Sequence, residues 1–320
     1  MPIGLQRIWL IWCDMQATVA QTQKKRAINK QTWALLLLLF PALLWLTILY
    51  LGSLFGLLWQ SVYRLDDFTG QVVHKIGFHT ILQLFTSANF DIVLRTTTMA
   101  ICVTIAAAIL ALPLAYTMVF HASKRQRGIL YVAILAPMWF SYLVKVYGWR
   151  VLLSREGLIY WVLNKLGLGG ALDFVLHSFP AIGGASLASS FLGMFLVFLY
   201  MWLPFMVLPI IAALERVPQN MLNASSDLGA TPWQTFKKVT LPLTMPGIIA
   251  GGIFTFSLTL GDYIIPQVVG APGYFIGMMV YTQQGTVGNL PLAAAFSLVP
   301  IILIMLYLSM AKRLGAFDAL

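Results

Sequence analysis

Long apolar runs constrain this chain of 320 residues more than any other feature. The first, Trp33–Trp59, contains no charged side chain and would form a helix of roughly 40 Å, long enough to cross a bilayer with some tilt. Five further runs have a similar length and composition, and together they predict an all-α membrane protein with six transmembrane helices. The predicted spans are Trp33–Trp59, Val93–Phe120, Ile129–Arg150, Phe191–Ala213, Leu243–Ile265 and Leu290–Ala311.

The distribution of charge orients these spans. Of the 20 Lys and Arg residues, 13 fall in segments that the six-span topology places on one side of the membrane. Short loops rich in Lys and Arg are retained in the cytoplasm, so we predict that both termini and the loop 214–242 are cytoplasmic. The net charge of +10 is therefore the charge bias of a membrane protein, and it does not indicate a nucleic-acid partner.

The segments outside the spans give the domain organisation. Residues 1–32 are predicted to be a cytoplasmic tail, because the apolar run Ile8–Trp12 is too short to span and precedes its basic residues, the reverse of a signal peptide. Residues 33–320 are predicted to form one transmembrane domain without an internal repeat. The outer segments 60–92 and 155–190 are predicted to be loops, the second because Gly and Ser cluster at 167–170 and 183–190.

Enzyme classes are disfavoured by the motifs. The sequence has no G-x-x-x-x-G-K-[ST] loop, so we expect that any ATP is bound by another polypeptide and that this chain holds no cofactor. His74 and His79 lack the spacing of zinc ligands, and neither Cys13 nor Cys102 is placed for a disulfide or a metal cluster. With 60% hydrophobic and 9% charged residues, a soluble enzyme is excluded, and we expect a transport subunit without catalytic activity.

The longest polar interval on the basic side, Leu214–Pro242, has the pattern of two short helices around a glycine. Pro218 is suited to open the first helix, and Gly229 to follow it as a left-handed residue. The apolar stripes expected are Met221, Leu222, Ser225 and Leu228 on the first helix, and Trp233, Phe236 and Val239 on the second. Apolar side chains on a cytoplasmic loop face water unless a partner covers them, so the loop is interpreted as a docking element.

The second helix of this loop has defined ends in the sequence. Thr231 and Gln234 have the spacing of a capping box, and Pro232 between them occupies the first helical position. Pro242 is expected to end the helix, since proline lacks the backbone N–H that a helix interior needs.

The same residues carry a family resemblance. The stretch Asn223-Ala224-Ser225-Ser226-Asp227-Leu228-Gly229-Ala230, with Phe236 and Leu241-Pro242, resembles the EAA motif, the cytoplasmic coupling loop of ABC-importer permeases. ALERVPQNMLNASSDLGA, TLPLTMPGIIAG, APMWFSYLVKVYGW, YMWLPFMVLP and SLTLGDYIIPQVVG are similar to spermidine/putrescine-type permease subunits, and the resemblance extends from Trp33 to the C-terminus. Asn223 stands where that family usually has a glutamate, which affects the salt-bridging part of the coupling contact and not its shape.

The resemblance implies a multi-pass subunit of the bacterial inner membrane with the type I ABC importer permease fold. It implies a second homologous permease subunit, ABC ATPase subunits that bind the ATP, and an extracytoplasmic substrate-binding protein. It further implies that polyamines such as spermidine and putrescine are imported; another cationic or amine-bearing solute, such as an amino acid or an opine, is the alternative substrate. The residues implied in ATPase coupling are Asn223, Ala224, Ser225, Asp227, Gly229, Ala230, Phe236, Leu241 and Pro242.

The candidate substrate path centres on Asp262, an acidic residue at the end of the fifth predicted span. A carboxylate is costly inside a bilayer, so it faces either a cavity that receives a cation or the interface as a capping group. Tyr263 adjoins it, and Trp139 and Tyr142 belong to a segment expected to end at the same outer level, where their rings would offer faces to an ammonium group. An ion pair with Lys145 is the competing interpretation of Asp262.

Two other function classes remain as alternatives. A secondary transporter would need a proton or sodium relay within the membrane, for which Asp262 is the only candidate, and it would leave the loop 214–242 without a role. A membrane-embedded enzyme would need a catalytic constellation, and the sequence contains none that can be argued.

Overall fold

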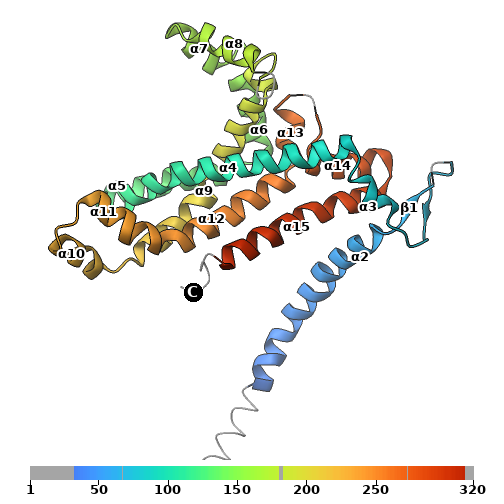
Figure 1. Ribbon diagram of the computed structural model, residues 1–320, viewed down its shortest axis with the longest axis horizontal. Coiled ribbons are helices and arrows are strands. Elements are labelled where there is room, and N and C mark those ends of the chain that lie inside the picture. Colours follow the sequence, from blue (N-terminus) through green and yellow to red (C-terminus); the bar gives the residue numbers. More distant parts are fainter. Residues whose placement is uncertain (1–31, 67, 180–182, 272, 314–320) are drawn as a thin grey trace, which may run out of the picture. The chain divides into compact units, whose positions relative to one another are not determined.

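The computed structural model describes residues 32–66, 68–179, 183–271 and 273–313 (Figure 1). The chain divides into two units, Met1–Trp59 and Gln60–Leu320. The predicted tail 1–32 lies outside the described residues except for Thr32, and so does Cys13. The last residues of the predicted transmembrane domain, 314–320, also lie outside them.

The described part of the first unit is helical. The helix Thr32–Gln60 has a π-helical stretch, η1 (Leu46–Leu51), followed by α2 (Gly52–Gln60). Its length of 29 residues and its composition are those of a membrane-spanning helix, which confirms the first predicted span.

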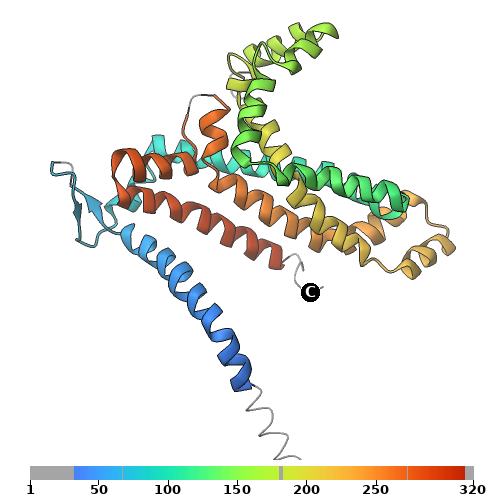
Figure 2. The same cartoon turned by 180° about the vertical axis from the view of Figure 1, so that it is seen from behind.

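Four long helices carry the second unit (Figures 1 and 2): α4 (Ser87–Phe120), α9 (Phe191–Glu215), α12 (Leu241–Gly261) and α15 (Leu290–Arg313). They confirm the second, fourth, fifth and sixth predicted spans, although α4 begins at Ser87 rather than Val93. Side chains of α9 belong to both of the largest buried clusters of the described chain, one shared with α4 and the other mainly with the segments after α5 and α12. The core is thus a helical bundle without a soluble domain in the described residues.

Small residues let these helices approach one another closely, as is usual for helices in membranes. Along α4, the side chains Ala100, Ala107, Ala111 and Ala115 are fully buried. On α12, a Cβ atom added to Gly247 would lie 2.6 Å from the backbone oxygen of Pro209 in α9. Gly247 therefore marks a contact between the two backbones.

We expect Gly247→Ala to destabilise the second unit, because the added methyl group meets a backbone oxygen that cannot rotate away. Overpacking of this kind costs about 1–3 kcal/mol. Gly128→Ala in α5 is the matched control, since a Cβ there meets nothing within 4 Å and the helix propensity of Ala is higher. Thermal unfolding of the purified protein in detergent should show a lower midpoint for Gly247→Ala alone. Equal midpoints for the two variants would contradict the close contact.

The third predicted span, Ile129–Arg150, is bent and does not form one straight helix. The chain forms α5 (Lys124–Trp139) and then α6 (Tyr142–Leu153). The segment Tyr142–Lys165, which begins with α6, is bent by 99° relative to α5. Phe140 and Ser141 between them have extended backbone angles, with ψ of 147° and 136°, which interrupts the helical hydrogen bonds. The described residues therefore hold five continuous helices able to cross a membrane, and a sixth span only if the bent pair counts as one.

The outer segments predicted to be loops contain secondary structure. Residues 60–92 form a small antiparallel pair, β1 (Arg64–Leu65) and β2 (Val72–Val73), and then α3 (His79–Gln83). Residues 155–190 form α7 (Leu158–Lys165), α8 (Gly169–Ser178) and the 3₁₀ turn η2 (Leu187–Ser189). Gly167, at φ of 74°, makes the turn between α7 and α8, and the glycine cluster was misread because the next two glycines begin α8.

Two groups of shorter elements lie at the two ends of the bundle, as Figure 1 shows. α10 (Gln219–Asp227), α11 (Pro232–Thr235) and the π-helical stretch η3 (Phe236–Thr240) lie with the start of α5 at one end. α14 (Ile276–Thr282) lies with α3 at the other. α13 (Ile264–Val268) follows α12 after a short break, and the π-helical stretch η4 (Gln283–Val287) follows α14.

Candidate functional site

The loop 214–242, which the sequence predicts to be cytoplasmic, folds largely as expected. Pro218 is the N-cap of α10, and Gly229 has the left-handed φ of 74° expected after that helix. Thr231 Oγ1 accepts from the backbone N–H of Gln234, and Gln234 Oε1 accepts from the backbone N–H of Thr231 at 2.8 Å. The predicted capping box is therefore confirmed.

The prediction that Pro242 ends the second helix is wrong. The helix is continuous from Pro232 to Gly261, 30 residues in which α11, η3 and α12 follow one another. The π-helical η3 widens the turn just before the proline, and the backbone N–H of Leu241 bonds to the oxygen of Phe236. Because of this wider turn, the helix continues through Pro242 although proline has no N–H group to donate. The second helix of the loop and the fifth span are consequently one continuous helix.

A groove of about 680 Å³ lies between α10 and the start of this long helix. Ser225 Oγ and Thr235 Oγ1 bridge the two helices at 2.8 Å. Of the residues implied in ATPase coupling, those in the groove lining are Ala224, Ser225, Gly229, Ala230 and Pro242. Leu228, 88% exposed, is also part of this lining. The groove thus joins an apolar surface to the turn at Gly229.

The other residues implied in coupling lie around the groove. Asn223 and Asp227 are exposed on α10, and Asn223 Oδ1 accepts from Gln219 Nε2 at 3.4 Å. Leu241 is half-buried at the start of α12. Phe236 stacks on Trp233, with ring centroids 5.5 Å apart.

Two contacts tie this loop to neighbouring helices. The Phe236 ring meets the ring of Tyr116 in α4 edge to face, with centroids 5.6 Å apart. Arg127 of α5 pairs with Glu215 at the end of α9, and Tyr131 also donates to Glu215 at 3.3 Å. The basic first turn of α5 and the loop 214–242 therefore lie at the same end of the second unit.

At the other end of α12, the helix stops at Gly261 and Asp262 has an extended ψ of 132°. Asp262 Oδ1 accepts from the backbone N–H groups of Ile264 and Ile265 at 2.8 and 2.9 Å, which caps the first turn of α13. The hydroxyl of Tyr142 donates to Asp262 Oδ2. The carboxylate is therefore both a capping group and the acceptor of a side chain from α6.

A cavity of about 310 Å³ opens beside this carboxylate. Tyr142, Trp202, Ser257, Asp262 and Tyr263 line it, and the rings of Tyr142 and Trp202 stack with centroids 6.0 Å apart. Three of the four predicted path residues thus lie together. This Asp262 cavity combines one carboxylate with aromatic faces, a combination suited to an ammonium group.

Two sequence-based ideas about Asp262 are not supported. Trp139 is 78% exposed at the end of α5 and is not part of the cavity lining, because the break at Phe140 turns the two helices apart. The described residues contain two ion pairs, Asp91–Arg95 and Arg127–Glu215, so Lys145 forms none with Asp262. Nor do three His, Cys, Asp or Glu side chains gather anywhere in the described residues as a metal site would require.

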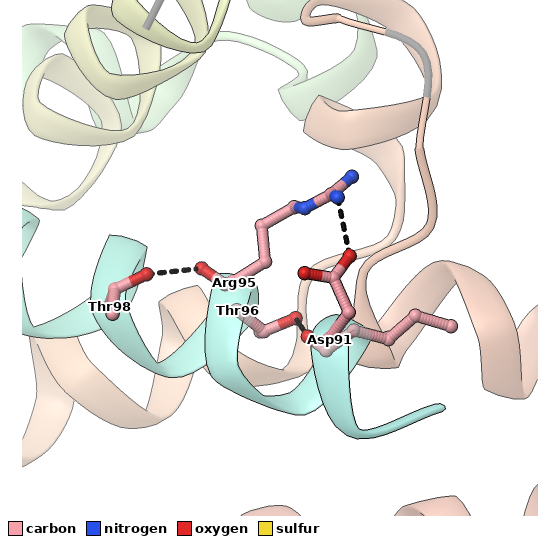
Figure 3. A network of polar contacts seen from close by, with 5 residues as sticks. Asp91, Arg95, Thr96 and Thr98 are labelled. Carbon is pink, nitrogen blue, oxygen red and sulfur yellow. Dashed lines mark hydrogen bonds and ion pairs between the residues drawn. The ribbon is translucent and has the colours of Figure 1, made fainter. Parts of the chain in front are cut away.

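A polar network lies near the start of α4 (Figure 3). Arg95 pairs with Asp91 at 2.5 Å, and its guanidinium lies 5.4 Å from the centroid of the Phe191 ring. Thr96 Oγ1 donates to the Ile92 oxygen at 2.8 Å and accepts from the backbone N–H of Ile276 at 3.0 Å. Thr96 thereby satisfies the first N–H group of α14, a helix 180 residues away in sequence.

Residues 31–315 match the family described as binding-protein-dependent transport system inner membrane component. The chain belongs to this family. It is a permease subunit of an ABC importer and a multi-pass protein of the inner membrane, as its sequence predicts.

Relatives of this permease agree with that assignment. It is 58% identical over 286 residues to the inner membrane ABC transporter permease protein YdcU of Escherichia coli (strain K12), covering 89% of this chain and 91% of that protein. It is 28% identical to the spermidine/putrescine transport system permease protein PotB of the same organism, covering 75% of this chain and 78% of the relative.

Solved structures confirm the type I ABC importer permease fold. A chain of a bacterial ABC transporter involved in the import of the acidic polysaccharide alginate superposes with a TM-score of 0.68 at 18% identity, covering 89% of this permease and 96% of that chain. A chain of the MetNI methionine ABC transporter superposes with a TM-score of 0.53 at 17% identity, covering 76% and 98%. At these identities the comparison supports the fold alone.

Sequence reasoning missed several residues of the permease that the fold brings together. Tyr116 and Thr96 lie within a predicted span, where nothing in the local pattern distinguishes them from lipid-facing residues. Arg127 and Glu215 carried a weak signal, because an acid at the start of the loop 214–242 and a basic turn predicted on the same side of the membrane can form an ion pair. Trp202 was read only as part of an apolar span.

Proposed function

We propose that this permease imports polyamines of the spermidine/putrescine class, with Asp262 as the acceptor of a substrate ammonium group. The observation that carries the proposal is the Asp262 cavity, where a carboxylate and the Tyr142 and Trp202 rings line one space. A cavity at membrane depth must replace the lost hydration of a cation, and carboxylates and aromatic faces do so. The relation to PotB, a spermidine/putrescine permease, supports the same substrate class.

In this proposal the transport cycle is driven from the loop 214–242. Two ABC ATPase subunits bind ATP and dock on the groove beside Gly229 and on its counterpart in a second, homologous permease. Because α11, η3 and α12 are one helix, movement of the docked ATPase is transmitted to Gly261, directly before Asp262. A substrate-binding protein on the outer side delivers the polyamine. The permease itself transmits the energy and binds no nucleotide.

The substrate class is tested by competition. Cells that depend on this transporter should take up labelled putrescine, and excess unlabelled spermidine should suppress that uptake strongly. Equal excess of a neutral amino acid or of an acidic sugar should leave it unchanged. Uptake that only the amino acid suppresses would favour the alternative, an amine-bearing solute such as an amino acid or opine.

The proposed orientation gives a second prediction. Gln71 precedes β2 on the side that we assign to the outside, whereas Lys124 and Asn223 lie on the side that we assign to the cytoplasm. In a background with Cys13 and Cys102 replaced, a membrane-impermeant maleimide should label Gln71→Cys in intact cells. Lys124→Cys and Asn223→Cys should be labelled only after the cells are opened. Labelling of Asn223→Cys from outside would show that the assigned orientation is wrong, and the loop could then not bind a cytoplasmic ATPase.

A further inference from the structure

We propose that the Asp262 cavity continues into a second subsite, formed by Tyr263, Tyr281 and Gln284, which binds another ammonium group of the same substrate molecule. This inference rests on the proposed function, since it assumes that a polyamine enters the Asp262 cavity. It adds a specificity determinant in α14 and η4, elements that the sequence left without a role.

The second subsite is a cavity of about 380 Å³ between the end of α12, α14 and α15. It shares Gly261 and Tyr263 with the Asp262 cavity, so the two spaces adjoin at the break after α12. Tyr281 of α14, Gln284 of η4 and Ser297 of α15 belong to its lining. An elongated molecule that passes the break would therefore contact both sets of residues.

The feature that suits this subsite to a cation is a pair of stacked tyrosines. The rings of Tyr263 and Tyr281 are nearly parallel, with an interplanar angle of 11° and centroids 4.7 Å apart. Tyr263 is 37% exposed and Tyr281 is 48% exposed, so stacking leaves part of each ring accessible. Aromatic faces attract ammonium groups, and the amide oxygen of Gln284 adds a hydrogen-bond acceptor to the same lining.

The spacing between the two subsites is fixed by backbone contacts. A Cβ atom added to Gly277 would lie 2.5 Å from the backbone oxygen of Asp262, so the first turn of α14 packs directly on the break. Thr96 holds the same turn through the N–H group of Ile276. Tyr281 lies four residues after Gly277, on the same face of the helix, and this places its ring beside Tyr263.

The two subsites differ in chemistry. The lining of the Asp262 cavity contains a carboxyl group, whereas the described lining of the second cavity holds aromatic, hydroxyl, amide and aliphatic groups and no carboxyl group. A monoamine gains from the carboxylate alone. A linear polyamine places one ammonium group at Asp262 and the next over the tyrosine pair, so it gains from both. The permease would therefore favour substrates with several ammonium groups along an unbranched chain.

The test compares Tyr281→Leu, Tyr281→Phe and Tyr274→Leu in proteoliposomes that contain the complete transporter and its binding protein. Tyr281→Leu removes the aromatic face and should lower the rate of putrescine uptake about tenfold. Tyr281→Phe keeps the face and should stay within about twofold of the wild-type rate. Tyr274 is a matched control, since it is 44% exposed, precedes α14 and lines neither cavity. Tyr274→Leu should transport normally.

The inference is overturned if Tyr281→Leu transports at the wild-type rate, or if Tyr281→Phe loses as much as Tyr281→Leu. It is also overturned if Tyr281→Leu lowers the thermal unfolding midpoint in proportion to its loss of uptake, since the ring would then be structural. Asp262→Asn, measured in the same preparation, separates this result from the proposed function. If uptake is impaired in Asp262→Asn and normal in Tyr281→Leu, the second subsite alone is refuted. If uptake is normal in Asp262→Asn, the proposed function is refuted.

Discussion

Gly229→Val is expected to leave the permease in the membrane and to abolish uptake. Gly229 has a φ of 74°, and a left-handed backbone costs an ordinary residue about 1–2 kcal/mol, with a larger penalty for a β-branched one. The turn also contains two backbone hydrogen bonds: Gly229 N–H donates to Ser226 O at 2.9 Å, and Ala230 N–H donates to Ser225 O at 3.1 Å. Valine would break this turn and separate α10 from α11, which deforms the groove.

Uptake and substrate-stimulated ATP hydrolysis measure this effect in the assembled transporter. Both should fall at least about tenfold in Gly229→Val, while Gly229→Asn should keep much of the activity because asparagine tolerates the left-handed region. A Cβ at position 229 meets nothing within 4 Å, so the loss would reflect the backbone turn or the docked partner and not internal crowding. Normal transport by Gly229→Val at normal expression would remove the docking role of the turn.

The loop illustrates how far local sequence carries a prediction. Pro218, Gly229 and the pair Thr231–Gln234 each act on their immediate backbone, and each behaves as its residue type requires. Pro242 does not end the helix as its residue type predicts, because the π-helical η3 before it accommodates the missing N–H group. The sequence shows no signature of η3. The consequence is structural as well, since the second helix of the loop and α12 form one continuous helix, Pro232–Gly261.

The spans show a similar limit. Long apolar runs predict the helices α4, α9, α12 and α15, because a bilayer requires their length and composition. The same composition conceals the break after Trp139, at Phe140 and Ser141, where the segments Lys124–Trp139 and Tyr142–Lys165 are bent by 99°. That break decides which aromatic residues reach the Asp262 cavity: Tyr142 after it does, and Trp139 before it does not.

Contacts between segments distant in the chain could not be predicted from the sequence. Asp262 was found as an acid at the edge of a span, but its hydrogen bond from Tyr142 depends on the packing of α6 against α13. The pair Tyr263–Tyr281 and the Thr96–Ile276 bond likewise depend on how α14 folds back on the bundle. These residues are ordinary in their own neighbourhoods and become a site only in the fold.

Asp262→Asn is expected to have the second large effect, on transport rather than on folding. Asparagine keeps the size of the side chain and an oxygen that can accept from the N–H groups of Ile264 and Ile265, so the cap of α13 is retained. It removes the negative charge, and a hydrogen bond to a charged group contributes about 1.5–3 kcal/mol. Uptake of a polyamine at low concentration should fall about tenfold to a hundredfold.

Two control variants distinguish the effect of the Asp262 carboxylate from the effects of Tyr142 and Lys145. Tyr142→Phe removes the hydroxyl that donates to Asp262 but keeps the ring on Trp202, so its effect should be smaller than that of Asp262→Asn. Lys145→Met should leave uptake unchanged, because Lys145 lies on the same helix as Tyr142 without an ion pair to Asp262. A loss in Lys145→Met equal to that in Asp262→Asn would indicate that the two residues act as a pair after all.

The most direct test of the central claim is the initial rate of spermidine uptake into proteoliposomes containing the complete transporter, for wild type and for Asp262→Asn. ATP hydrolysis without substrate and the thermal unfolding midpoint are measured in the same samples. The proposed cation site predicts a rate at least about tenfold lower in the variant, with basal ATP hydrolysis and stability unchanged. An unchanged uptake rate would contradict it, and Asp262 would then be a capping residue of α13 with the substrate passing elsewhere.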